Sequence, residues 1–385
     1  SSRWLMRFKN MLPFKTLSYT GDISGKIALV RLDLNVPILQ GCVRDDFRIA
    51  QSLPTLSFLQ KAGAKILVLA HIESVETNSL SPVFEHLKTR AETKDIVFAK
   101  TLSEAKTALE TLPAGGIVLL ENLRSFGDKE KNNDVGFAQE LASLGDFYVN
   151  DAFAVSHRPH ASIVCVPQLL PHYAGFQFEK EYTKLSEAFV PQHPFVFILG
   201  GAKFDTKLPL VTKFLEKADT VFIGGALSND IFKQQGLEVG ASVISAHPVD
   251  LRVIMASPKL LIPTDARVNT PTTTPKQLQE VLASDKILDA GPETIADLKK
   301  ALAGAQFVLW NGPLGDYEKG FSQSTIDLAN AIIESGAYSV VGGGDTLAVL
   351  GKAGLLNQFS FVSTGGGAML DFLVNESLPG IEALK

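Results

Sequence analysis

The sequence predicts an α/β protein of two Rossmann-like, parallel-sheet domains of similar size. Two observations predict this class. Short apolar runs alternate with segments of helical spacing along the chain, as in βαβ units, and most of these runs end in glycine or in a polar residue. A chain of 385 residues is also longer than one typical core can organise, which favours two domains.

The first half contains the apolar runs expected of one sheet. Continuous runs rich in β-branched residues indicate strands that are buried on both faces. The predicted strands are Lys26–Asn35, Ala64–Ala70, Asp95–Ala99, Gly116–Leu120 and Asp146–Asn150. A first helix is predicted to begin at Asp45, with acidic residues in its first turn. Further helices are predicted at Ser79–Arg90, Leu102–Leu112 and Val135–Ser143.

The second half repeats the alternation after a break. A helical pattern over Phe176–Ala188 ends at Val190–Pro194, so we expect domains at 1–185 and 186–375, joined by a helical hinge. Apolar runs at Phe195–Leu199, Thr220–Ile223, Leu260–Ile262, Phe307–Trp310, Tyr338–Val341 and Phe359–Val362 predict the second sheet.

Composition excludes several classes of protein. The net charge of −5 argues against a general nucleic-acid binder. No run reaches 18 apolar residues, so we expect no membrane span. The two cysteines fit neither a disulfide framework nor a zinc site, which favours a cytoplasmic protein. The basic N-terminus, with Arg3, Arg7, Lys9 and Lys15, leaves a targeting remnant as an alternative.

Polar residues follow the strands of the first half. In parallel sheets ligands bind beyond the carboxyl ends of the strands. Each residue alone is most often a surface or capping residue, but several arginines and histidines at one sheet edge predict a pocket for a small anion. The residues at these ends are Asp33, Asn35, His71, Arg124, Asn150, Asp151, His157 and Arg158.

Glycines follow the strands of the second half. One pair of glycines usually marks a tight turn, but repeated pairs at one sheet edge, with Lys203 and Lys207, predict a polyphosphate site. Because helical spacing covers Ala202–Lys217, both lysines are expected on one helix face. Asp345 is a candidate Mg²⁺ ligand, with an N-cap role for the helix Thr346–Leu350 as the alternative.

The catalytic motifs that the chain lacks narrow the chemistry. There is no GxxxxGK[ST] motif, no kinase-type combination of GxGxxG, HRD and DFG, and no recognisable nucleophile with its base. An anion pocket in one domain and a polyphosphate site in the other are compatible with direct phosphoryl transfer. In such reactions positioning and charge neutralisation provide the catalysis.

Eight motifs in this order make the chain resemble the phosphoglycerate kinase family from about Lys15 to its end. The first half contains RLDLNVP at Arg31–Pro37, DDFRI at Asp45–Ile49, LLENLR at Leu119–Arg124 and YVNDAF…HRPHAS at Tyr148–Ser162. The second half contains LGGAKFDTK at Leu199–Lys207, WNGPLG at Trp310–Gly315, VGGGDT at Val341–Thr346 and STGGGA at Ser363–Ala368.

The resemblance implies an activity. The family transfers the acyl phosphate of 1,3-bisphosphoglycerate reversibly to Mg-ADP, which gives 3-phosphoglycerate and ATP in glycolysis. It also closes about a hinge over a cleft between its domains and packs its C-terminal tail, here 376–385, on the first domain. We expect a monomer that binds these small molecules with Mg²⁺ as cofactor. Two alternatives stay open: a non-catalytic binding or scaffold relative, and a phosphotransferase for another small acyl phosphate.

The resemblance also implies site residues. Catalytic roles fall to Arg48, Lys203 and Lys207, and the metal is linked to Asp345. The counterparts of Asp33, Asn35, Arg48, His71, Arg124 and Arg158 hold the glycerate substrate, with Ser74 at the position of a further substrate residue. The nucleotide side comprises Lys207, Asn311, Glu318, Gly343, Gly344, Asp345 and Thr346, and the helix start at Gly365, Gly366 and Gly367 faces the transferring group.

Two positions depart from the family pattern. The family has His-Leu-Gly-Arg where this chain has His71, Ile72, Glu73 and Ser74, so an arginine that binds the non-transferred phosphate is replaced by Ser74, and Glu73 adds a negative charge. The family usually has three glycines where this chain has Gly224-Gly225-Ala226, which leaves the choice between ATP and GTP open.

The first departure predicts a weaker KM for 3-phosphoglycerate. Loss of one charge-assisted hydrogen bond costs about 1.5–3 kcal/mol, or roughly 10- to 150-fold in binding. A Ser74→Arg variant should therefore lower this KM with little change in kcat, as measured by steady-state kinetics. An unchanged KM would mean that another residue already compensates.

Overall fold

The computed structural model describes residues 12–247, 249–269 and 275–385. The basic residues Arg3, Arg7 and Lys9 lie outside these ranges. The chain divides into two compact units, the first containing residues up to Thr183 together with Asn375–Lys385 and the second Lys184–Val374. The division falls within helix α7 (Phe176–Ser186), two residues before the expected boundary.

The first unit is built on a six-stranded parallel sheet in the order β5-β6-β4-β1-β7-β8. Its central strands are almost entirely buried, as their continuous apolar sequences predict. The strands are β1 (Ile27–Leu32), β4 (Lys65–Leu69), β5 (Val97–Ala99), β6 (Ile117–Leu120), β7 (Phe147–Asp151) and β8 (His172–Ala174).

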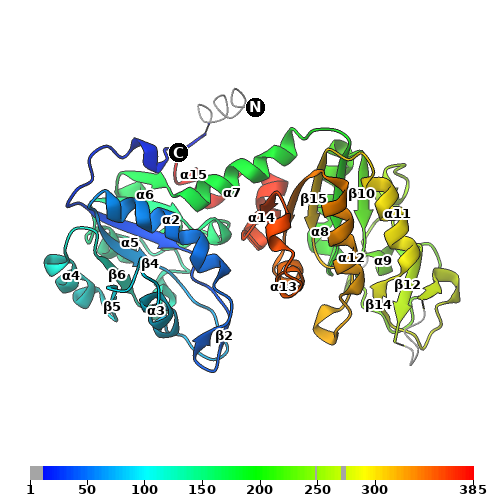
Figure 1. The fold of residues 1–385 in the computed structure, drawn as a ribbon, viewed down its shortest axis with the longest axis horizontal. Coiled ribbons are helices and arrows are strands. Elements are labelled where there is room, and N and C mark those ends of the chain that lie inside the picture. The colour runs from blue at the N-terminus through cyan, green and yellow to red at the C-terminus, as the bar shows by residue number, and fades with distance from the viewer. Residues whose placement is uncertain (1–11, 248, 270–274) are drawn as a thin grey trace. The chain divides into compact units, whose positions relative to one another are not determined.

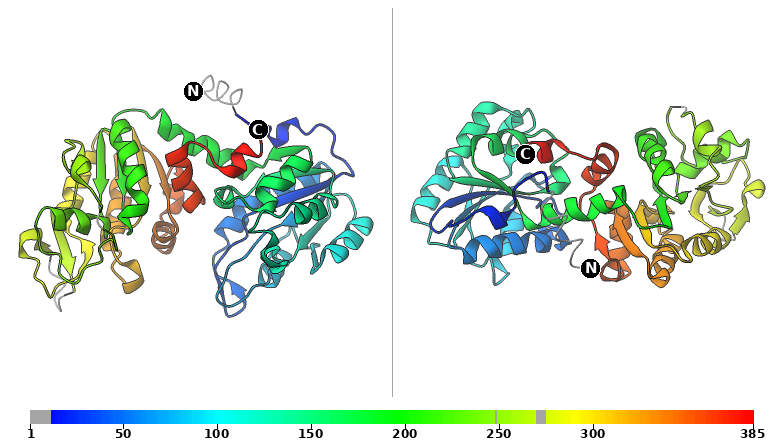
Figure 2. Two further views of the ribbon diagram at one scale, coloured as in Figure 1. Left: turned by 180° about the vertical axis from the view of Figure 1, so that it is seen from behind. Right: turned by 90° about the horizontal axis from the view of Figure 1, so that it is seen from above.

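Helices cover both faces of this sheet (Figures 1 and 2). They are α2 (Phe47–Lys61), α3 (Ser81–Lys88), α4 (Leu102–Thr111), α5 (Val135–Ala142), α6 (Ala161–Leu169) and α7, and the short hairpin β2 (Ile38–Leu39) and β3 (Cys42–Val43) precedes α2. On one face, the apolar residues of α2 and α3 pack on alternate strand residues in one continuous core.

The second unit contains another six-stranded parallel sheet, in the order β11-β10-β9-β15-β16-β17. The strands are β9 (Phe195–Leu199), β10 (Thr220–Ile223), β11 (Leu260–Leu261), β15 (Phe307–Asn311), β16 (Tyr338–Gly342) and β17 (Phe361–Val362). The helices are α8 (Phe204–Lys217), α9 (Leu227–Gln234), α10 (Arg252–Met255), α11 (Pro292–Leu302), α12 (Gln323–Ser335), α13 (Gly344–Lys352) and α14 (Gly367–Asn375).

An antiparallel sheet that the sequence pattern does not predict lies in the second unit. Strand β12 (Asp265–Val268) pairs with β13 (Pro275–Gln277) and β14 (Ile287–Ala290). These strands are short, and polar residues interrupt their apolar pattern, so periodicity gives little signal. The buried carboxylate of Asp265 joins this sheet to α11 by accepting hydrogen bonds from the Glu293 and Thr294 N–H groups.

The last helix of the chain belongs to the first unit. Helix α15 (Pro379–Glu382) packs on α6, and the Gly380 N–H donates to the Ser156 carbonyl oxygen (2.8 Å). A Cβ atom at Gly380 would lie 2.6 Å from Ser156 Cβ, so only glycine permits this approach.

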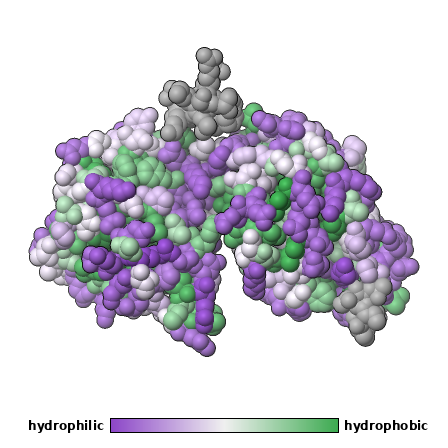
Figure 3. Space-filling view, in the orientation of Figure 1, coloured by the Kyte–Doolittle hydropathy of each residue, from purple (hydrophilic) through white to green (hydrophobic). Residues whose placement is uncertain are grey.

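The two predicted parallel sheets and their α/β class are confirmed. Among the described residues no helix is long and apolar enough to cross a membrane. On the face drawn in Figure 3, hydrophobic residues form small patches among hydrophilic ones, which is the ordinary pattern for the surface of a folded domain.

The turn after β9 generates a stability prediction. A Cβ atom at Gly200 would lie 2.3 Å from the Pro313 carbonyl oxygen, which is backbone and cannot move aside cheaply. We expect Gly200→Ala to destabilise the second unit by about 1–3 kcal/mol. Urea unfolding, followed by the fluorescence of the buried Trp310 in a Trp4→Phe background, measures the free energy of unfolding of this unit.

Gly351→Ala is the matched control in α13. Its Cβ atom would make only an ordinary contact, 3.6 Å from Leu356 Cδ1, so it should be neutral or stabilise by about 0.4–1 kcal/mol. Equal midpoints for the two variants would contradict the close-packing argument.

Candidate active site

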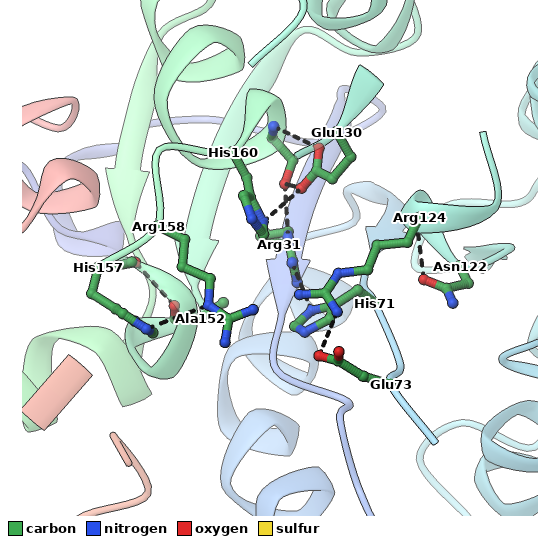
Figure 4. A network of polar contacts seen from close by, with 12 residues as sticks. Arg31, His71, Glu73, Asn122, Arg124, Glu130, Ala152, His157, Arg158 and His160 are labelled. Atoms are coloured by element: carbon green, nitrogen blue, oxygen red, sulfur yellow. Dashed lines mark hydrogen bonds and ion pairs between the residues drawn. The ribbon is translucent and has the colours of Figure 1, made fainter. Parts of the chain in front are cut away.

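In the first unit the carboxyl ends of β1, β4, β6 and β7 place the predicted polar residues at one sheet edge. Figure 4 shows His71, Arg124 and Arg158 converging there from three different segments. Arg31, which is on β1 itself, contacts His71. The topology therefore brings together cations that are far apart in the sequence, as the strand-end pattern predicts.

Arg31 is a buried cation, and each of its three guanidinium nitrogens makes a hydrogen bond. It is 0% exposed. Its Nε donates to Ser162 Oγ (2.9 Å), Nη1 to the Leu32 carbonyl oxygen (2.5 Å) and Nη2 to His71 Nδ1 (3.0 Å). Ser162 Oγ donates in turn to the buried Glu130 carboxylate (2.6 Å), so a hydroxyl bridges a buried positive and a buried negative charge.

The contact with Arg31 fixes the state of His71. A guanidinium can only donate, so His71 Nδ1 must accept and the ring proton is on Nε2. Burial, followed by the charge of Arg31, lowers the pKa of His71 well below its usual range. His71 is therefore a neutral residue with one N–H donor left for a ligand.

His160 is also neutral. Burial, with the charges of Arg31 and Arg124, lowers its pKa to about 4. Its Nδ1 is 3.8 Å from Glu130 Oε1, which is beyond hydrogen-bond distance. The positive charge that remains at this sheet edge is thus carried by arginines.

Part of the Arg124 guanidinium lacks a partner among the described residues. Its side chain is 9% exposed, and Nη1 donates to Glu73 Oε2 (2.6 Å). Its Nε and Nη2 are buried and have no hydrogen-bond partner among the described residues. Two orphaned guanidinium donors are costly unless an anion binds them, so they indicate a ligand site.

A second group of predicted residues is joined to this one by hydrogen bonds. Arg48 Nη1 donates to Asp33 Oδ2 (3.1 Å) and to the Asn35 carbonyl oxygen (3.2 Å). Asn35 Oδ1 accepts from the Glu73 N–H (2.9 Å), and Glu73 contacts Arg124. Asp33 and Asn35 therefore hold Arg48, and Asn35 also links this pair to Glu73 and Arg124.

Other strand-end residues have different roles. Ser74 Oγ accepts from the Glu76 N–H (3.2 Å) and closes its own loop. Arg158 is exposed, and its Nε donates to His157 Nε2 (3.4 Å). Asn150 and Asp151 are both buried. Asp151 has a structural role, because its carboxylate accepts from the Gln177 and Phe178 N–H groups at the start of α7.

In the second unit a cavity of about 290 Å³ lies between the glycine turns of the main sheet and the small antiparallel sheet. Of the predicted nucleotide residues, Glu318 and Asp345 line it, together with Gly201 and Gly225. Its mixture of apolar walls and a few polar groups is typical of a small-molecule site.

The lysine prediction was wrong in its geometry. Helix α8 begins at Phe204, and Lys203 precedes it with φ = +66°, in the left-handed region. Lys203 and Lys207 are therefore not one turn apart on one helix face. Lys207 Nζ instead folds back and donates to the Gly200 carbonyl oxygen (2.9 Å).

Several glycine N–H groups are already used within the protein. Those of Gly200 and Gly201 donate to the carbonyl oxygens of Asn311 and Pro313, and that of Gly312 to Thr346 Oγ1. For these residues the close-packed turn is the better explanation. The Gly365 N–H likewise donates to Ser363 Oγ. By contrast, the N–H groups in the first turns of α13 and α14, which begin at Gly344 and Gly367, have no acceptor within their helices.

Asp345 lies inside α13, whose N-cap is Gly343, so the alternative N-cap role was wrong. It is exposed, lines the cavity and accepts from the Tyr317 hydroxyl (3.2 Å). No cluster of three metal-ligating side chains occurs in the ranges described above. A single exposed carboxylate fits Mg²⁺, because that ion typically takes one or two carboxylates together with phosphate oxygens.

Two parallel α/β units, one with orphaned arginine donors and one with a cavity that holds an exposed carboxylate, are typical of a kinase for small anionic substrates. A family model described as phosphoglycerate kinase matches residues 19–376. The phosphoglycerate kinase of Caulobacter sp. (strain K31) is 39% identical over 97% of this chain and 100% of its own, and that of Herpetosiphon aurantiacus 40% over 94% and 97%.

Solved structures agree. That of phosphoglycerate kinase from Coxiella burnetii has a TM-score of 0.83 at 34% identity and covers 97% of this chain and 99% of its own. The structure of the Pyrococcus horikoshii enzyme also has a TM-score of 0.83, at 28% identity, and covers 96% of this chain and 98% of its own. This chain belongs to the phosphoglycerate kinase family, whose members transfer phosphate to a carboxyl acceptor.

The state of Lys207 generates a pH prediction. Burial lowers its pKa to about 8, with the charge of Asp345 acting in the opposite direction. Above pH 8 the free enzyme loses this positive charge, so the Kd for ADP should rise about three- to tenfold between pH 7 and pH 9. Calorimetric titration measures it. Lys207→Arg, which stays charged, should abolish the rise; the same slope in both proteins would contradict the assignment.

Proposed function

We propose that this chain is an active phosphoglycerate kinase that transfers the acyl phosphate of 1,3-bisphosphoglycerate to ADP reversibly. One observation carries the acceptor side: the buried Nε and Nη2 of Arg124 have no partner among the described residues, and the Arg124 side chain lies beside the neutral His71 ring (Figure 4). A phosphate or carboxylate oxygen would satisfy these donors.

The first unit would hold the glycerate substrate. Arg124, Arg158 and the Nε2–H group of His71 donate to its anionic groups, and Ser74 leaves space where the family has a further arginine. Asp33 and Asn35 fix Arg48, which faces the moving phosphoryl group. Because Arg48 is held by a carboxylate and a carbonyl oxygen, it needs little reorganisation during the reaction.

The second unit would hold the nucleotide in its cavity. Glu318 binds the ribose, and Lys203 and Lys207 neutralise the phosphates. Bound Mg²⁺, held by Asp345 and phosphate oxygens, would neutralise developing charge. The starts of α13 and α14 supply N–H donors to phosphate, the former from Gly343, Gly344 and Thr346 beside Asn311, the latter from Gly366 and Gly367, because the Gly365 N–H is taken by Ser363 Oγ.

The transfer is direct. A β-phosphate oxygen of ADP attacks the acyl phosphate, the bond from phosphorus to the carboxyl oxygen breaks, and a carboxylate leaves. Arg48, Lys203 and Lys207 neutralise the charge on the transferring group, so no covalent enzyme intermediate is needed. In-line transfer requires that the two substrates meet, so a hinge movement during turnover is part of the proposal.

The cellular setting follows the same argument. A glycolytic enzyme with two free cysteines is best suited to the reducing cytoplasm. Both units have their own buried cores, so we propose that the protein acts as a monomer.

A coupled assay tests the proposal. It follows ATP- and Mg²⁺-dependent consumption of 3-phosphoglycerate by the wild type, Lys207→Ala and the control Lys233→Ala, which removes an exposed lysine of α9. We expect saturable turnover, with kcat reduced about 10²–10³-fold in Lys207→Ala and unchanged in the control. No turnover with nucleotide binding intact would favour a binding protein or a different acceptor.

A further inference from the structure

The backbone of Glu73 is held from two sides at the edge of the acceptor pocket. Its N–H donates to Asn35 Oδ1 (2.9 Å). The preceding residue, Ile72, exchanges two hydrogen bonds with the Asn122 side chain, and Asn122 Oδ1 also accepts from the Arg124 N–H. The amide of Asn122 thus ties the Glu73 loop directly to the arginine segment.

The side chain of Glu73 occupies part of the anion-binding group. Its Oε2 accepts a hydrogen bond from Nη1 of Arg124 (2.6 Å), while Nε and Nη2 of Arg124 have no partner among the described residues. Figure 4 shows this carboxylate beside His71, at the point where Arg124 enters the pocket. An internal anion therefore lies where an external one is expected to bind.

The two partners differ in freedom to move. The Arg124 side chain is 9% exposed, whereas that of Glu73 is 64% exposed. Nearby charge keeps Glu73 ionised, because the hydrogen bond from Arg124 and the arginine's charge lower its pKa. Glu73 therefore has room to turn into water when another anion arrives, whereas burial restricts Arg124.

We propose that Glu73 is a displaceable internal anion that sets the charge selectivity of the acceptor pocket. This inference rests on the proposed function and deepens it. Glu73 holds one arm of Arg124 in the free protein, and each anionic ligand must break that contact and then tolerate the nearby carboxylate.

Charge selectivity follows from Coulomb's law. Repulsion by one carboxylate grows with the charge of the ligand. A phosphate monoester carries about −1.5 to −2 at pH 7 in addition to any carboxylate, whereas D-glycerate carries the carboxylate charge alone. Glu73 thus penalises 3-phosphoglycerate more than it penalises the unphosphorylated acid.

Calorimetric titration of the full-length chain tests this inference. We expect Glu73→Gln and Glu73→Ala to lower the Kd for 3-phosphoglycerate about three- to tenfold, and that for D-glycerate less than twofold. The KM for 3-phosphoglycerate should fall by the same factor with kcat within about twofold, because Glu73 contacts no reacting atom. Glu85→Gln removes an exposed carboxylate of α3 that pairs with Lys88 at 3.4 Å, and should change neither constant.

The possible results separate the two proposals. If the wild type binds and turns over 3-phosphoglycerate but both Glu73 variants keep its Kd, the inference is wrong and the proposed function stands. An equal gain for D-glycerate also overturns the charge selectivity. If the wild type neither binds nor turns over 3-phosphoglycerate, the proposed function fails, and the inference fails with it.

Discussion

A buried cation constrains the whole acceptor side of this protein. Removing a guanidinium from water costs several kcal/mol unless it is fully hydrogen-bonded and compensated. Each nitrogen of Arg31 has an acceptor, in Ser162, the Leu32 carbonyl oxygen or His71, and Glu130 is the opposing buried charge. These contacts join β1 to the end of β4 and to the start of α6, so the strand-end geometry and the state of His71 follow from one side chain.

The burial of Arg31 also decides which side chains of the acceptor side carry charge. Arg31 and Glu130 balance each other inside the unit, and burial keeps His71 and His160 neutral. Arg124 and Arg158 therefore carry the positive charge that a substrate meets. Glu73 already neutralises part of the charge of Arg124 through their ion pair. Asn35 and Asn122 hold the backbone of the Glu73 loop in the position that allows this contact.

The second unit uses glycine for two different purposes. Gly200 and Gly312 let two turns of the main sheet pack backbone against backbone, and their N–H groups are consumed within the protein. At the starts of α13 and α14 the chain instead leaves N–H groups without intrahelical acceptors. A glycine-rich sequence alone does not separate these uses, because both need a residue without Cβ.

The sequence by itself determined the α/β class, both parallel sheets and the arginines and histidines at the strand ends, because these depend on local periodicity and on the fixed direction of parallel strands. Tertiary structure decided the rest. The left-handed Lys203, the burial of Arg31 with Glu130, the pairing of Glu73 with Arg124 and the small sheet around β12 depend on contacts between distant segments. A charged residue within the apolar run of β1 was the one local signal of Arg31; whether a partner meets it depends on three-dimensional packing, which periodicity does not encode.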